Sequence, residues 1–398
     1  MATWLHDIDE RMRRHYEQYP YPRYSLFGSI RAQDSYIFSL EALWAHFHGE
    51  RIRPGTGERV LLAGSGSFLP YPVSVANPHA RIDALDLSAS SLARARLHAL
   101  RHLRFNIDYL AGDLMDGSIA PGPYRYIDSF GVLHCIPDFA QALRALAERL
   151  APGGILRVMV YSRDGRSEVE RARTLCAERG ISTPREVRRL ARTDETLREC
   201  MRDSFELGFD EGLADAFLIP YAKTFVVDEI LEALSAAPLA LVRFCHQGAL
   251  PDLQSELARI RALEKKRAFP TNLAFYALKV PRPSAAPTAP AAPTAPTAPT
   301  APASPIRQTA RPAFGSAEPG RLLDWIELNP LLRGAVRLPS PGSSYLPPKF
   351  GPGNPPLDAA ARAFLRRFIR PLRAEALAAE EKERARAFLD RLILISYS

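Results

Sequence analysis

Two glycines and an aspartate are the residues whose types and spacing point most directly to chemistry. Gly64 and Gly66 follow the apolar run 60–63, and Asp86 ends a second apolar run twenty positions after Gly66. This spacing is typical of a nucleotide-binding β-α-β unit. In such a unit the glycine turn lets the backbone approach a ligand, and the carboxylate accepts hydrogen bonds from the two ribose hydroxyls. We therefore predict a ligand that contains a ribose.

The nature of that ligand follows from a missing glycine. Dinucleotide enzymes use a third glycine to pack helix on strand around a pyrophosphate, and residues 64–69 lack it. A ligand without phosphates, such as S-adenosylmethionine, does not need that geometry. Asp113 follows the short run 106–111, in which apolar and polar residues alternate. At that position its carboxylate would accept a hydrogen bond from an adenine amino group. We predict S-adenosylmethionine as the cofactor, with a nicotinamide-dependent oxidoreductase as the less favoured alternative.

Residues 59–162 resemble the core of the class I S-adenosylmethionine-dependent methyltransferases. The resemblance rests on the Gly-x-Gly turn, Asp86, Gly-Asp at 112–113, Gly-Val-Leu-His at 131–134 and Pro-Gly-Gly at 152–154. The nearest likeness is to a bacterial group that carries Tyr-Pro-Tyr-Pro-Arg, here residues 19–23, and is sometimes fused to tetratricopeptide repeats. The resemblance implies an α/β fold with a doubly wound, mostly parallel seven-stranded sheet. It also implies SN2 transfer of a methyl group to an acceptor, which it does not identify.

The expected cofactor contacts lie at the strand ends and in the turns of this core. They are Gly64, Ser65, Gly66, Asp86, Leu87, Asp113, Leu114, Phe130 and Gly131. Each also has a structural interpretation. The two glycines would simply form a tight turn, and Asp86 would be the N-cap of a helix. Asp113 would be an ordinary loop residue, and Phe130 would pack in the core.

Catalysis of methyl transfer depends mainly on aligning the acceptor with the methyl group, and a base is needed only if the acceptor must lose a proton. His134 and Tyr161 are the candidates for such a group, and a buried structural histidine is the alternative for His134. Tyr19, Tyr21 and Arg23 are expected to form a lid, since two prolines stiffen their segment. Alternatively, they only pack an N-terminal cap against the sheet.

Residues 68–72, Phe-Leu-Pro-Tyr-Pro, depart from the family pattern. Two prolines predict a helix that begins late, because proline fits only the first turn. Phe68 would crowd the methionine end of the cofactor. These features favour an alternative of another class, in which a degenerate methyltransferase fold acts as a protein-binding module.

Composition restricts the partners. The net charge is +8, and after residue 303 fifteen Arg and Lys face nine Asp and Glu, so the surplus is concentrated there. A basic tail attracts nucleic acid or lipid nonspecifically, or is simply solvated; no specific nucleic-acid motif is present. No apolar run has the length of a membrane span. The four cysteines are widely spaced, which predicts no metal site, no disulfides and a cytoplasmic location.

The chain divides into four expected parts. Residues 1–50 form an N-terminal helical cap, and residues 51–280 a methyltransferase domain with a helical insertion, 165–235, on the substrate side. Residues 281–305 form an Ala/Pro/Thr-rich linker, and residues 306–398 a Pro-rich and helical region with helices at 357–370 and 372–395. So small a core is marginal alone, so we expect this region to bind a protein partner or to self-associate. A chain that ends near Val280 is expected to fold and to keep its cofactor affinity.

Overall fold

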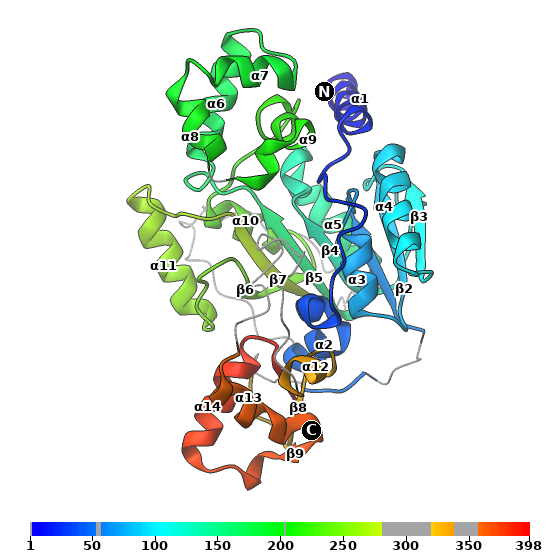
Figure 1. The fold of residues 1–398 in the computed structure, drawn as a ribbon, viewed down its shortest axis with the longest axis vertical. Helices are drawn as coiled ribbons and strands as arrows, with labels where there is room; N and C mark the ends of the chain where they lie inside the picture. The colour runs from blue at the N-terminus through cyan, green and yellow to red at the C-terminus, as the bar shows by residue number, and fades with distance from the viewer. Residues whose placement is uncertain (1, 53–56, 203, 281–319, 338–356) are drawn as a thin grey trace, which may run out of the picture.

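A seven-stranded sheet forms the centre of the computed structural model, which describes residues 2–52, 57–202, 204–280, 320–337 and 357–398 (Figure 1). The strand order is β3-β2-β1-β4-β5-β7-β6. β7 runs antiparallel to both of its neighbours, and the other neighbouring pairs are parallel. The strands are β1 (Arg59–Ala63), β2 (Arg81–Asp86), β3 (Ile107–Ala111), β4 (Tyr124–Phe130), β5 (Leu150–Val160), β6 (Leu239–Phe244) and β7 (Leu273–Lys279). The predicted doubly wound, mostly parallel seven-stranded sheet is confirmed.

Helices cover both faces of the sheet. Successive strand residues point to opposite faces, so Val60 and Leu62 belong to one buried cluster, and Leu61 and Ala63 to the other. This burial on two sides explains why β1 reads as a continuous apolar run. One face carries η1 (Ala32–Phe38), α2 (Leu40–His48), α3 (Pro70–Ala76) and α4 (Ala89–Arg101), and the other α5 (Phe139–Arg149), α10 (Val227–Ser235) and α11 (Leu253–Lys265).

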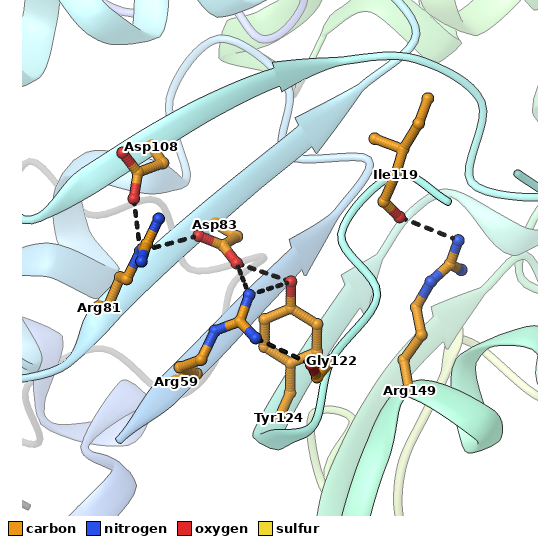
Figure 2. A network of polar contacts seen from close by, with 8 residues as sticks. All are labelled: Arg59, Arg81, Asp83, Asp108, Ile119, Gly122, Tyr124 and Arg149. Atoms are coloured by element: carbon orange, nitrogen blue, oxygen red, sulfur yellow. Dashed lines mark hydrogen bonds and ion pairs between the residues drawn. The ribbon is translucent and has the colours of Figure 1, made fainter. Parts of the chain in front are cut away.

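A polar network fixes the amino ends of β1, β2 and β4, at the sheet edge opposite the glycine turn (Figure 2). Asp83, which is 2% exposed, accepts from the Arg59 guanidinium at 2.5 Å and from the Tyr124 hydroxyl at 2.6 Å. Arg59 also donates to the Gly122 carbonyl at 2.9 Å. Because the buried carboxylate is paired with Arg59 and hydrogen-bonded to Tyr124, it stabilises one register of the three strands.

The N-terminal residues occupy two places rather than forming one cap. α1 (Ala2–Gln18) packs through Ile8 and Met12 against Ile219 at the carboxyl edge of the sheet, whereas η1 and α2 lie on its face (Figure 1). The predicted helix 32–48 is divided at Ser39, whose hydroxyl caps α2 by accepting from the Ala42 N–H. The segment between the two places is therefore stretched past the end of β1.

A group of helices follows β5 within the stretch 165–235, whose last helix, α10, packs on the sheet instead. The group contains α6 (Ser167–Glu178), α7 (Pro184–Leu190), α8 (Glu195–Arg202), η3 (Phe205–Gly208), α9 (Asp210–Leu213) and the π-helix η4 (Ala214–Leu218). These helices share a small core of their own that includes Cys176, Leu197 and Phe217. They lie beyond the carboxyl ends of the strands, beside α1 (Figure 1).

The C-terminal region is less helical than predicted. Its three-stranded antiparallel sheet has the order β10-β8-β9. The expected helix 372–395 is only α14 (Ala379–Leu389), because both ends of that stretch pair with β8. The other elements are β8 (Trp325–Leu328), η5 (Pro330–Leu332), α12 (Arg333–Arg337), α13 (Ala359–Arg366), η7 (Arg367–Ile369), β9 (Leu372–Arg373), η8 (Ala374–Ala376) and β10 (Leu394–Tyr397).

The C-terminal region packs on η1 and α2 (Figure 1). Ile395 lies against Ala42 and Ala45, which are 0% and 2% exposed. Buried Glu327 accepts from Arg333 at 2.7 Å and forms an ion pair with Arg51 at 3.0 Å. Because α2 is buried between the sheet and this region, these contacts predict, against the expectation above, that the chain does not fold independently of its tail.

The contacts just described do not test the other expectations for the tail. The predicted linker, 281–305, lies outside the described residues. A protein partner or self-association through residues 306–398 stays a prediction. In the described part of the chain, no helix has the length and apolar character needed to cross a membrane.

Candidate cofactor and acceptor site

The glycine turn and Asp86 adjoin each other at the carboxyl ends of β1 and β2. The N–H groups of Gly64 and Ser65 both donate to the Leu85 carbonyl, at 2.8 and 2.9 Å. One oxygen of the Asp86 carboxylate accepts from the Gly66 N–H at 2.7 Å, and the other from the Ser88 N–H at 2.9 Å. The carboxylate is thereby fixed in the wall of a cavity, with lone pairs left for further donors.

Burial raises the pKa of Asp86 from 3.8 to about 6, although the N–H groups of Ser88 and Gly66 act in the opposite direction. The carboxyl is therefore ionised at neutral pH and protonated in mild acid. A ribose hydroxyl donates to the ionised form, and a charge-assisted bond of this kind is stronger than a neutral one. Asp86 fits the role of ribose acceptor above about pH 6.

Cofactor affinity is expected to fall as the pH is lowered through about 6. Below that pKa each unit of pH decreases the ionised fraction about tenfold, so binding weakens by up to the same factor. The stability of the unliganded protein has the opposite pH dependence. Because the pKa of Asp86 is raised in the folded state, protonation of its carboxyl stabilises that state. Calorimetric titration with S-adenosylhomocysteine between pH 5 and pH 8, on wild type and Asp86→Asn, measures the effect. An equally steep loss in Asp86→Asn would assign it to another group.

One cavity of about 1090 Å³ contains all nine expected cofactor contacts in its wall. These residues follow the strand order β2-β1-β4: Asp86 ends β2, the glycine turn follows β1, and Phe130 ends β4 with Gly131 directly after it. Asp113 also lines the cavity, while its carboxylate accepts from the Met115 N–H at 2.8 Å. The structure thus brings these residues together.

Because Gly64 and Gly66 have no side chain, other parts of the chain can pack closely against the turn. Both have left-handed backbone angles, with φ of 76° at Gly64 and 57° at Gly66. A Cβ at Gly66 would lie 2.8 Å from the Tyr21 carbonyl oxygen, and one at Gly64 would lie 2.3 Å from Val132. A close approach by a ligand was expected here. In the structure the residues 19–23 segment and Val132 take it.

The segment at residues 19–23 lies against the glycine turn. The Tyr21 carbonyl accepts from the Ser67 N–H at 3.1 Å, and the Pro22 carbonyl accepts from the Ser67 hydroxyl. Tyr21 lines the cavity, but Tyr19 and Arg23 do not. Of the three expected lid residues, the structure therefore places one at the site.

Tyrosines of the N-terminal segment meet carboxylates of the insertion across this cavity. The Tyr21 hydroxyl donates to Glu206 at 2.7 Å, and the Tyr16 hydroxyl to Asp215 at 2.9 Å. Tyr24 also donates to Glu206. Arg23 forms an ion pair with Glu211 farther out. These bonds link two segments that are far apart in the sequence.

Tyr161 lies between His134 and Arg166. Its ring centroid is 3.6 Å from that of His134 and 3.7 Å from the Arg166 guanidinium carbon. Two groups this close to one centroid must lie on opposite ring faces. His134 is 1% exposed and does not line the cavity, so it cannot reach an acceptor. Its placement agrees with the structural interpretation rather than with a base.

Tyr161 does line the cavity, but it is a poor base. Burial raises the pKa of its hydroxyl, so the group keeps its proton at neutral pH. Burial also lowers the pKa of His134 well below its usual range, which keeps the imidazole neutral. The pair therefore supplies shape and a hydrogen-bond donor.

Phe68 does not crowd the site. It is 1% exposed, and its ring centroid lies 4.5 Å from that of Tyr24 and 5.5 Å from that of His98. It points into the core of the face that carries η1, and α3 begins at Pro70. The late start of this helix is confirmed, while the expected clash with the cofactor is wrong.

Sequence reasoning missed several residues of the cavity wall. Arg166, Glu206 and Asp215 come from the insertion, which was assigned to the substrate side without naming residues. Asp390, Arg391 and Leu392 come from the C-terminal region. Within the described residues, no cluster of three or more His, Cys, Asp or Glu side chains is placed to hold a metal ion.

The strand order and the reversed β7 define the class I methyltransferase fold. Residues 61–156 match the family model described as a methyltransferase domain. The matched segment includes the glycine turn, Asp86, Asp113 and the end of β4. The match supports S-adenosylmethionine as the cofactor.

Similar proteins cover only parts of the chain. An uncharacterized protein of Synechococcus is 28% identical over 243 residues, which cover 58% of each chain. A ubiquinone biosynthesis O-methyltransferase of Bordetella bronchiseptica is 32% identical over 114 residues, 28% of this chain and 46% of that protein. The structure of PKMT2 from Rickettsia typhi has a TM-score of 0.48 and 17% identity, with 65% of this chain and 54% of that chain covered. This chain thus spans about half the length of the curated relatives it matches.

Proposed function

We propose that the protein is an S-adenosylmethionine-dependent methyltransferase whose acceptor enters the same cavity as the cofactor. The observation that carries the proposal is the Asp86 carboxylate, held beside the Gly64–Gly66 turn at the adjoining ends of β1 and β2. In this proposal the carboxylate that accepts hydrogen bonds from the ribose hydroxyls lies next to a turn that lacks the phosphate-binding glycine pattern. We further propose membership of the bacterial group with Tyr-Pro-Tyr-Pro-Arg near its start. The cytoplasmic location stays a prediction.

The cofactor supplies a methyl group on a sulfonium, which leaves as a neutral thioether when the acceptor atom attacks the methyl carbon. The protein's part is to hold the acceptor in line with that bond. Tyr21 and Glu206 close the cavity on one side, and Phe130 and Tyr161 form its floor at the ends of β4 and β5. Neither His134 nor Tyr161 is available as a base.

The volume of the cavity leaves room for a small acceptor beside the proposed cofactor. Sites for single drug-sized ligands usually measure about 300–1,000 Å³, and this cavity, at about 1090 Å³, lies just above that range. Because segments from the N-terminus, the insertion and the C-terminal region all contribute to the wall, we propose a small molecule or a free chain end as the acceptor.

The Asp86→Ala substitution is expected to weaken binding of S-adenosylhomocysteine by about 1.5–3 kcal/mol, since it removes the charged partner of the ribose hydroxyls. Isothermal calorimetry on wild type, Asp86→Ala and the exposed-loop control Asp116→Ala measures the loss. A thermal melt of each variant separates it from unfolding, because Asp86 also accepts two backbone N–H groups. A folded wild type that binds neither S-adenosylmethionine nor its product would favour the protein-binding module instead. Binding of NAD alone would favour an oxidoreductase.

A further inference from the structure

Arg166 is a cationic side chain in the cavity wall that the proposed cofactor contacts leave unused. Its guanidinium carbon lies over the Tyr161 ring, 3.7 Å from the centroid. Among the described residues, the buried Nε of Arg166 has no hydrogen-bond partner. No ion pair within this part of the chain includes Arg166, whose guanidinium carries five donors, although Asp215 and Glu170 lie close enough to raise its pKa.

Such an arrangement calls for an acceptor from outside the chain. Buried polar groups in folded proteins are almost always hydrogen-bonded, so an exception requires an explanation. A guanidinium presents a planar fork that matches a carboxylate or phosphate, and stacking on Tyr161 fixes its orientation. The nearby carboxylates Glu206 and Asp215 already accept from the tyrosine hydroxyls of the N-terminal segment.

The position of Arg166 along the sheet indicates which molecule carries the anion. Asp86 ends β2, and Tyr161 follows β5, with β1 and β4 between them. Neighbouring strands lie about 4.8 Å apart, so three intervals separate the two residues by about 14 Å. A cofactor that is held by its ribose at Asp86, crosses the glycine turn and reaches Phe130 and Gly131 at the end of β4 leaves the end of β5 to the acceptor.

We propose that Arg166, held in place by Tyr161, binds a carboxylate or phosphate group of the methyl acceptor. This inference rests on the proposed methyltransferase function. It assigns the acceptor to the anionic compounds and makes the β5 side of the cavity its specificity site. No proton moves and no bond changes at Arg166, whose role is to bind and orient.

Another candidate for the anion that Arg166 binds is the carboxylate of the cofactor's own methionine. Titrating Arg166→Met with S-adenosylhomocysteine and with 5′-methylthioadenosine, which lacks that carboxylate, separates the two sources. We expect both affinities to stay within about twofold of wild type. A loss of tenfold or more for S-adenosylhomocysteine, with methylthioadenosine unchanged, would assign Arg166 to the cofactor and overturn the proposal.

The acceptor arm uses benzoate and inorganic phosphate as probes, each titrated into protein that is saturated with S-adenosylhomocysteine. We expect wild type to bind at least one probe and Arg166→Met to bind it at least tenfold more weakly, as for the loss of a charged hydrogen-bond partner. Arg166→Lys should keep part of the affinity, because it retains the charge without the fork.

Arg163→Met is the matched control, since Arg163 lies three positions earlier, pairs with Glu229 at 3.6 Å and does not line the cavity. An equal loss in Arg163→Met would assign the effect to general charge, and a wild-type complex that binds neither probe would also refute the proposal. If wild type binds no S-adenosylhomocysteine but binds a probe in an Arg166-dependent manner, the anion site stands and the methyltransferase proposal fails.

Discussion

A chain that ends at Val280 is expected to lose its cooperative unfolding transition and to collect in the insoluble fraction. The truncation uncovers the outer side of α2, where Ala42 and Ala45 contact Ile395, and uncovers η1, where the Tyr36 carbonyl accepts from Asn329 at 3.4 Å. Burial of one large apolar side chain contributes about 1.5–3 kcal/mol, whereas a whole domain is stable by about 5–15 kcal/mol. Loss of several such contacts therefore exceeds what the remaining fold can tolerate.

Thermal melts and sedimentation of the truncated and full chains measure this effect. Co-expression of residues 306–398 as a separate chain is expected to restore solubility, since the same surfaces are again covered. Cofactor affinity should also decrease in the truncated chain, because Asp390, Arg391 and Leu392 form part of the cavity wall. A soluble truncated chain that melts within a few degrees of the full chain would restore the sequence-based expectation of an independent tail.

The Asp128→Ala substitution is expected to destabilise the fold by about 3–5 kcal/mol, the usual cost of breaking a buried ion pair from one side. Asp128 on β4 and Arg157 on β5 face each other in register, with Nε and Oδ2 3.1 Å apart. Their side chains are 0% and 3% exposed. The Tyr126 hydroxyl also donates to Asp128 at 2.7 Å. Removal of the carboxylate leaves the Arg157 charge in the interior without this partner.

Chemical denaturation of wild type and Asp128→Ala gives the difference in the free energy of unfolding. The double variant Asp128→Leu, Arg157→Met is the informative control, since apolar side chains of similar size often replace a buried pair at little cost. We expect it to recover most of the lost stability. A loss below about 1 kcal/mol in Asp128→Ala, typical of an exposed ion pair, would contradict the buried geometry.

Local sequence patterns were sufficient for the sheet and for the cofactor side of the cavity. Each strand of the core is a short apolar run, and its ligand-facing residue stands at the carboxyl end, so linear position fixes Asp86 and Phe130 in space. The sequence did not reveal why positions 64 and 66 are occupied by glycine. That Gly66 makes room for the Tyr21 carbonyl depends on a contact between segments that no local pattern encodes.

The C-terminal region shows where local reasoning fails. Its own apolar residues, such as Leu328 and Phe368, are too few for a separate core, which suggested an external partner. In the structure they share one cluster with Tyr36 and Phe38 of η1. A signal was present in the sequence of α2, where Ala42 and Ala45 leave the side opposite the large apolar residues without charged side chains. A helix that is apolar on two sides is covered on both; the prediction considered only the stripe of large side chains.

The packing of β10 on α2 has a consequence for the order in which the protein is synthesised. α2 leaves the ribosome early, but Ile395 and the Ser398 N–H, which donates to the Gly49 carbonyl at 3.1 Å, leave it late. Until then the nascent chain carries an uncovered apolar helix on an otherwise complete sheet, and exposed surface of this kind promotes aggregation. We expect translation to pass through a chaperone-dependent stage, and prematurely terminated products to be degraded rather than to accumulate as partly folded protein.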